Sequence, residues 1–105
     1  MIARSPNAAG RPTSAARIPL FGAGVQADRL VEQCGRQASV RTLPGGYGLE
    51  FGCGELLVCV ESEAIALLAS AEHHAALRQI KDVVALQLGR LAGAQAARVA
   101  WEELV

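Results

Sequence analysis

The chain has 105 residues, 51% of them hydrophobic and 19% charged, and its ten basic residues balance its ten acidic ones. This length fits one domain, and this composition predicts a packed core. The balanced charge leaves no overall field to attract nucleic acid or an anionic membrane surface. Its longest apolar run, residues 64–69, is far shorter than the roughly 20 residues of a membrane helix. We therefore expect neither nucleic-acid nor membrane partners.

The three cysteines are Cys34, Cys53 and Cys59, and no two of them have the Cys-x-x-Cys spacing. An odd number of widely spaced cysteines argues against a disulfide framework. The pattern is typical of a protein from a reducing compartment, and we expect a cytoplasmic location.

The first residues are rich in Pro, Gly, Ser and Ala, which predicts a disordered tail over residues 1–14 and a single domain over residues 15–105. Residues 16–20 read as a short edge strand, because Pro19 cannot donate to a central ladder. The apolar residues Val25, Leu30, Val31 and Cys34 then recur at helical spacing. This pattern predicts a short helix over residues 26–35 with one buried face.

The rest of the domain alternates short apolar runs with turn residues. We predict four strands, at residues 39–43, 47–51, 55–60 and 64–68. A helix over residues 72–91, with Ser70 as its N-cap, follows from an apolar stripe formed by Leu77, Ile80, Val84, Leu88 and Leu91. A final strand at residues 97–101 would close the sheet, with Val99 and Trp101 on one face.

These elements occur in the order β-α-β-β-β-β-α-β. They predict an α+β fold in which an antiparallel sheet carries both helices on one face and leaves the other face available.

Residues 43–55 contain five glycines and raise the question of a phosphate loop. Such a loop needs its glycines between a strand and the start of a helix, where free N–H groups bind the anion. Here the next element reads as a strand, and neither a Walker nor a dinucleotide-binding pattern is present. The glycines therefore indicate chain reversals between strands.

The side chains that could bind a metal are the cysteines together with His73 and His74. Adjacent residues on a helix point about 100° apart, so the two imidazoles cannot both face one ion comfortably. We expect no metal site and no cofactor.

Enzymatic chemistry has one partial candidate, Cys53, which lies in the Gly52-Cys53-Gly54 turn. An exposed thiol beside a base is the arrangement that thiol enzymes and redox sensors need. No nucleophile elbow and no suitably spaced pair of carboxylates accompanies it. The leading expectation is therefore a binding module that is not an enzyme, and a thiol-dependent enzyme or redox sensor using Cys53 is the alternative.

Several segments, taken in order, resemble the small bacterial family catalogued as domain of unknown function 2218. They are residues 30–34, 47–54, 76–84, 87–91 and 99–101. The resemblance covers most of the chain from about Ala16 onward and implies an α+β domain. Family members are associated with siderophore-interacting flavin reductases, which implies an accessory role in siderophore or iron handling.

The resemblance also implies candidate ligand-binding residues. Cys34, Arg90 and Trp101 match the family pattern, whereas Arg36 and Gln87 stand where relatives carry histidines. Gln87 can still form hydrogen bonds inside a cleft. The partner is expected to be a small ligand, another protein or, through an open sheet face or edge, a second copy of the chain.

Overall fold

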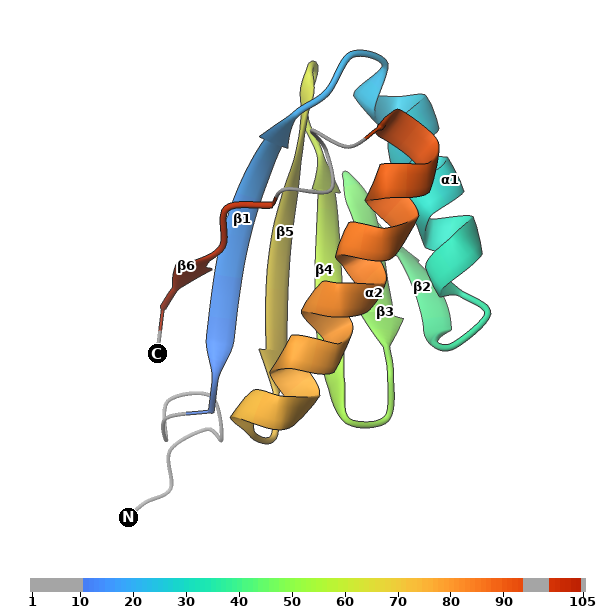
Figure 1. The fold of residues 1–105 in the computed structure, drawn as a ribbon. Helices are drawn as coiled ribbons and strands as arrows, with labels where there is room; N and C mark the ends of the chain where they lie inside the picture. The colour runs from blue at the N-terminus through green and yellow to red at the C-terminus, as the bar shows by residue number, and fades with distance from the viewer. Residues whose placement is uncertain (1–10, 94–98, 105) are drawn as a thin grey trace.

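The computed structural model describes residues 11–93 and 99–104, which form two helices and six strands (Figure 1). In chain order these are β1 (Thr13–Pro19), α1 (Ala23–Cys34), β2 (Ser39–Leu43), β3 (Gly46–Glu50), β4 (Gly54–Val60), β5 (Ala64–Ala71), α2 (His74–Ala92) and β6 (Glu102–Glu103).

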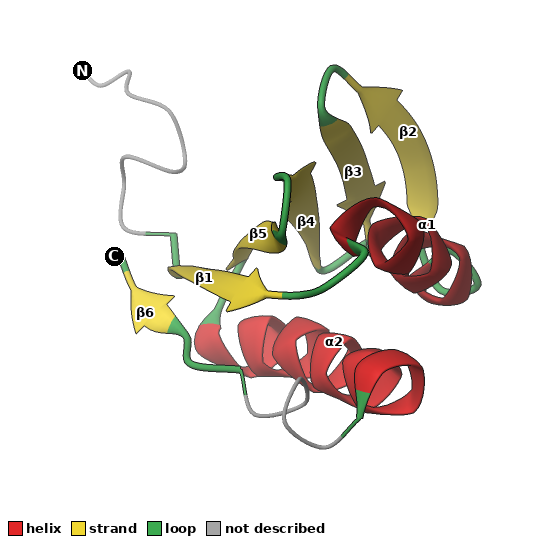
Figure 2. Cartoon of the chain, turned by 90° about the horizontal axis from the view of Figure 1, so that it is seen from above, coloured by secondary structure: helices red, strands yellow, loops and turns green. Residues whose placement is uncertain are grey.

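The strands form one antiparallel sheet in the order β2-β3-β4-β5-β1-β6. Consecutive strands β2 to β5 pair with their neighbours as a meander, and β1 pairs with β5. Both helices lie on the same side of the sheet (Figure 2). The predicted α+β class, element order and helix-covered face are confirmed.

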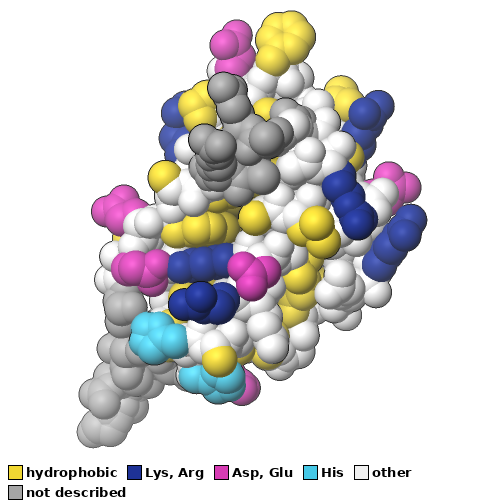
Figure 3. Space-filling model, in the orientation of Figure 1, with side chains coloured by type: hydrophobic (Ala, Val, Ile, Leu, Met, Phe, Trp, Pro, Cys, Tyr) yellow, Lys and Arg dark blue, Asp and Glu magenta, His cyan; other side chains and the backbone are white. Residues whose placement is uncertain are grey.

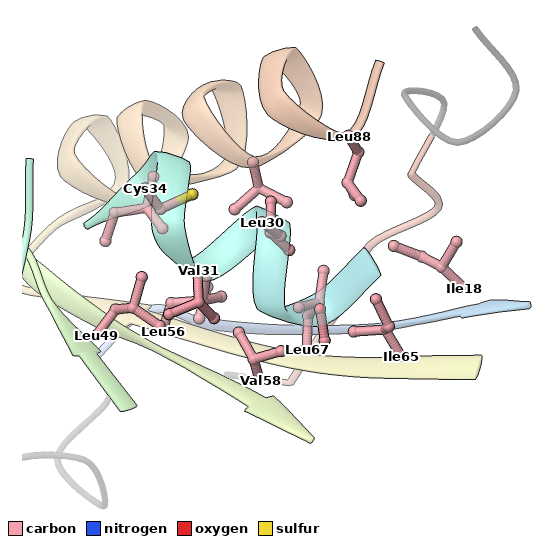
Figure 4. Close-up of a cluster of buried hydrophobic side chains, with 14 of the residues drawn as sticks. Ile18, Leu30, Val31, Cys34, Leu49, Leu56, Val58, Ile65, Leu67 and Leu88 are labelled. Atoms are coloured by element: carbon pink, nitrogen blue, oxygen red, sulfur yellow. The ribbon is translucent and has the colours of Figure 1, made fainter. Parts of the chain in front are cut away.

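The core lies between the helices and the inner face of the sheet, where side chains from α1, α2 and the strands converge (Figure 4). Leu30 of α1, Leu88 of α2, and Leu56 and Ile65 of the sheet are each 0% exposed. Burying an aliphatic side chain of this size contributes roughly 1.5–3 kcal/mol. Packing both helices against the sheet therefore supplies the main stabilisation.

The glycines of residues 43–55 form turns and close strand contacts, as the sequence predicts. Gly45 and Gly52 have φ angles of 77° and 87°, which favour glycine in the two chain reversals. A Cβ at Gly46 would overlap the carbonyl oxygen of Val58, and one at Gly54 would overlap that of Ser70. The segment brings three strands together and precedes no helix.

Helix α2 begins later than predicted, and its N-cap is His73 rather than Ser70. Ser70 is buried within β5, which continues to Ala71. The extended backbone of His73 lets its Nδ1 accept a hydrogen bond from the Ala76 N–H at 3.2 Å. Cross-strand pairing with β4 keeps Ser70 in the sheet, which overrides its capping preference.

Two further boundaries differ from the prediction. Strand β1 begins at Thr13, inside the predicted tail, because its first residues pair with Ser70 and Ala69 of β5. The last strand is Glu102–Glu103 instead of residues 97–101, of which 97 and 98 lie outside the described residues. Val25 of the predicted apolar stripe of the first helix is 58% exposed.

Within residues 11–93 and 99–104, neither helix has the length and apolar character that spanning a membrane requires.

Candidate ligand cleft

A cleft of about 680 Å³ lies between α2 and the C-terminal segment Val99–Glu103. Six polar or aromatic side chains line it, together with apolar residues of both walls. They are His74, Arg78, Lys81, Asp82, Trp101 and Glu103. The volume falls in the range of small-molecule sites in proteins, about 300–1,000 Å³.

The periodicity of α2 explains how one helix presents this wall. His74, Arg78, Lys81 and Ala85 follow one another at steps of three or four residues, so they form a stripe beside the buried one. Charged and histidine side chains gather along this face of the molecule, as the space-filling view shows (Figure 3). One stripe of α2 therefore packs in the core, and the neighbouring stripe presents polar groups to the cleft.

Lys81 connects the two walls of the cleft. Its Nζ lies 5.5 Å from the centroid of the Trp101 ring, within the range of a cation–π interaction. The same Nζ donates to Glu103 Oε2 at 2.6 Å, and this lysine side chain is only 20% exposed. The only lysine of the chain thus orients the indole and the carboxylate that face α2.

Glu103 is held from both sides. Besides Lys81, it accepts a hydrogen bond at 2.8 Å from the hydroxyl of Ser14, which is 0% exposed in β1. The hydrogen bond from Lys81, followed by that from Ser14, lowers the pKa of Glu103 below its ordinary value, and a smaller effect comes from the nearby His74. The carboxylate is consequently charged and already has a partner on each oxygen.

The groups that remain for a ligand are mostly donors. Arg78 and Lys81 carry several N–H donors and no acceptor, and His74 adds an imidazole, whereas Asp82 is the one lining carboxylate without a described partner. The flat indole of Trp101 offers a stacking surface. This arrangement suits a planar ligand that carries several acceptor oxygens.

Among the predicted ligand residues, Trp101 lines the cleft and the other four do not. Cys34 is 0% exposed in the core, and burial raises the pKa of its thiol to about 11. Arg36 is exposed in the turn after α1, and Arg90 is exposed in the last turn of α2. The structure therefore does not gather these residues into one site.

Gln87 is 6% exposed, and its Oε1 atom has no hydrogen-bond partner among the described residues. At 100° per residue it lies on the side of the buried stripe of α2 opposite Lys81, away from the cleft. This oxygen is a buried polar atom of the core, and Gln87 does not line the cleft.

Cys53 is half-buried in the turn before β4, and its carbonyl accepts a hydrogen bond from the Glu72 N–H at 3.3 Å. This contact brings the turn beside the start of α2. No hydrogen bond between the described residues involves the Cys53 thiol, and the Nδ1 of His73 is occupied by the helix cap. No group of three or more His, Cys, Asp or Glu side chains in the described ranges could hold a metal ion.

Sequence reasoning missed Lys81, Glu103, Arg78 and His74 as cleft residues. The stripe at positions 74, 78 and 81 is visible in the sequence, but it reads as the solvated edge of an amphipathic helix. Only the return of the C-terminal segment alongside α2 turns that edge into the wall of a cleft.

No family model and no curated protein matches the chain. Among solved structures, the chain is similar to the NMR structure of protein PA4090 from Pseudomonas aeruginosa, with a TM-score of 0.72 and 20% sequence identity. The match covers 87% of this chain and 95% of the other. At this identity the likeness shows a shared fold.

Proposed function

We propose that this domain is a binding module, not an enzyme, and that its ligand occupies the cleft between α2 and the segment Val99–Glu103. The observation that carries this proposal is the arrangement of Trp101, Lys81 and Glu103, with Lys81 at 5.5 Å from the indole centroid and 2.6 Å from the carboxylate. An aromatic ring beside several hydrogen-bond donors is an arrangement that suits the binding of a small ligand.

The chemistry of the cleft favours an oxygen-rich aromatic ligand. Such a ligand can stack on Trp101 and accept hydrogen bonds from Arg78 and Lys81. Catecholate groups, which are planar and carry two adjacent oxygens, fit this description. Siderophores that chelate iron through catecholates belong to this chemical class, and the resemblance to domain of unknown function 2218 supports an accessory role in siderophore or iron handling.

Binding can be measured with 2,3-dihydroxybenzoate and with ferric complexes of a catecholate and a hydroxamate siderophore. Trp101 is the only tryptophan, so its fluorescence reports directly on the cleft. Because ferric complexes absorb light, calorimetry and amide NMR shifts provide independent readings. We expect the catecholates to bind and to shift the signals of α2 between His74 and Ala85.

The matched variants are Arg78→Gln, in the cleft, and Arg90→Gln, on the same helix outside it. Losing a charge-assisted hydrogen bond weakens binding about tenfold or more, so Arg78→Gln should raise Kd by that factor while Arg90→Gln leaves it unchanged. Absence of binding by the folded protein, equal effects of the two variants, or shifts remote from α2 would each contradict the proposed site.

A further inference from the structure

The sheet face opposite the helices carries an ordered row of side chains. Alternate residues of each strand lie on this face, and the strand registers align them. Across the sheet from β2 to β6 the row reads Arg41, Gly48, Leu57, Leu68, Ala15 and Glu102. We call it the outer row.

The centre of the outer row is apolar. Leu57 and Leu68 are neighbours on β4 and β5, and with Ala66, Cys59 and other residues they line a shallow hollow of about 420 Å³. Leu68 is 37% exposed although β5 is a central strand. An antiparallel sheet face that meets water normally carries polar residues, so this composition is typical of a face that packs against something.

The two ends of the row carry opposite charges. The guanidinium of Arg41 lies across Gly48, where an added Cβ would come within 3.1–3.3 Å of it. Glu102 pairs with Ala15 at the other end of the row. Neither Arg41 nor Glu102 forms an ion pair with another described residue.

We propose that a second copy of this chain covers the outer face, related to the first by a two-fold axis parallel to β4 and β5. This rotation reverses the outer row. Leu57 of each copy then faces Leu68 of the other, the small residues Gly48 and Ala15 face each other, and Arg41 faces Glu102. Two-fold interfaces require such self-complementary surfaces.

The order of the row is the reason to prefer a second copy over an unrelated partner. The row runs from a basic end through a small residue, two leucines and a second small residue to an acidic end. When a second copy presents the same row in the reverse direction, each position meets a residue of complementary charge or similar size. Facing sheets pack about 10 Å apart, a gap that Arg41 and Glu102 can bridge from opposite sides. Ala15 of the facing copy leaves room for the guanidinium that lies across Gly48.

The first test measures the mass of the wild-type chain by analytical ultracentrifugation from micromolar to millimolar concentration, in reducing buffer because Cys59 is exposed. We expect a reversible dimer. Leu68→Asp should raise the dimer dissociation constant at least tenfold, since it buries an unpaired charge at the centre. Leu86→Asp, on the exposed side of α2, is the control and should leave the constant unchanged.

The second test exchanges the charges. Arg41→Glu alone and Glu102→Arg alone should each weaken the dimer severalfold, because each creates two like-charge contacts. The double variant Arg41→Glu/Glu102→Arg should restore the wild-type constant. Arg41 and Glu102 lie on opposite edge strands of one sheet, so contacts within one copy cannot explain this rescue. Circular dichroism confirms that each variant is folded.

Three outcomes would overturn the proposal: a monomer at every concentration, equal effects of Leu68→Asp and Leu86→Asp, or failure of the double variant to recover. None of these depends on whether the cleft binds a ligand, so this test stands apart from that of the proposed function.

Discussion

Glu103 shows how a single residue acquires its role from residues far away in the sequence. Its carboxylate is bound by Lys81 from α2 and by Ser14 from β1, and both contacts lower its pKa. The folded protein therefore binds fewer protons at this site than the unfolded chain does between the two pKa values. The resulting stabilisation is complete above the ordinary glutamate pKa of about 4.3 and is lost as the pH falls through the lowered pKa of the folded state.

Glu103→Gln should therefore lower the free energy of unfolding at pH 7, by no more than about 1 kcal/mol because exposed ion pairs are screened by water. The difference from wild type should shrink as the pH falls below about 4. Urea denaturation of both proteins between pH 7 and about pH 3 measures this difference in the free energy of unfolding. Glu32→Gln, an exposed change on α1, is the control, and a loss for Glu103→Gln that is unchanged in acid would contradict the assignment.

At the scale of elements, the β2–β3–β4 meander depends on glycine for two different reasons. Gly45 and Gly52 adopt positive φ angles, whereas Gly46 and Gly54 leave room for backbone atoms of a neighbouring strand. The sequence predicts the turns because glycine clusters punctuate apolar runs. Only the strand register shows at which glycines the backbone of a neighbouring strand comes too close for a side chain.

Gly46→Ala should destabilise the protein by roughly 2 kcal/mol or more, because its Cβ would overlap the Val58 carbonyl oxygen. Gly24→Ala provides the matched comparison, since an added Cβ at this helical glycine has no heavy atom within 4 Å apart from its chain neighbours and the backbone of its own helix. Alanine there should stabilise α1 by about 0.5–1 kcal/mol. Thermal unfolding followed by circular dichroism measures both, and equal shifts of Tm would refute the distinction.

For the whole molecule, α2 joins the core, the cleft and the surface through three of its faces. Leu88 is 0% exposed in the core, while Leu86, two residues earlier, is 54% exposed. The apolar stripe of this helix is predicted correctly from its period. The position of the helix against the sheet is what gives the faces their different environments.

Leu88→Ala should cost 2–5 kcal/mol, roughly the range for large-to-small changes in cores, because the surroundings cannot close the cavity. Leu86→Ala should remain within about 0.5 kcal/mol of wild type. Denaturant unfolding monitored by Trp101 fluorescence and by circular dichroism should give coincident transitions for both variants. Similar losses for the two variants would show that α2 does not pack as described.

Four features could be predicted from the sequence: the fold class, the element order, the helix-covered face and the role of the glycine cluster in turns. These features depend on local patterns, namely the periods of apolar residues and the conformational demands of turns. The N-cap of α2 was predicted wrongly, because cross-strand pairing with β4 overrides the capping preference of Ser70. Of the predicted last strand, the described residues 99–101 are not in a strand, and the chain pairs with β1 at Glu102–Glu103 instead.

The candidate cleft and the outer row depend on how the elements pack and pair in three dimensions. Lys81 meets Trp101 and Glu103 only because the chain returns beside α2, and Arg41 and Glu102 share a row only because β1 joins the meander and β6 pairs with it. Contacts between residues so distant in the sequence depend on topology and register. The period of a helix can be read from neighbouring residues in one sequence. Topology and strand register leave no such local pattern.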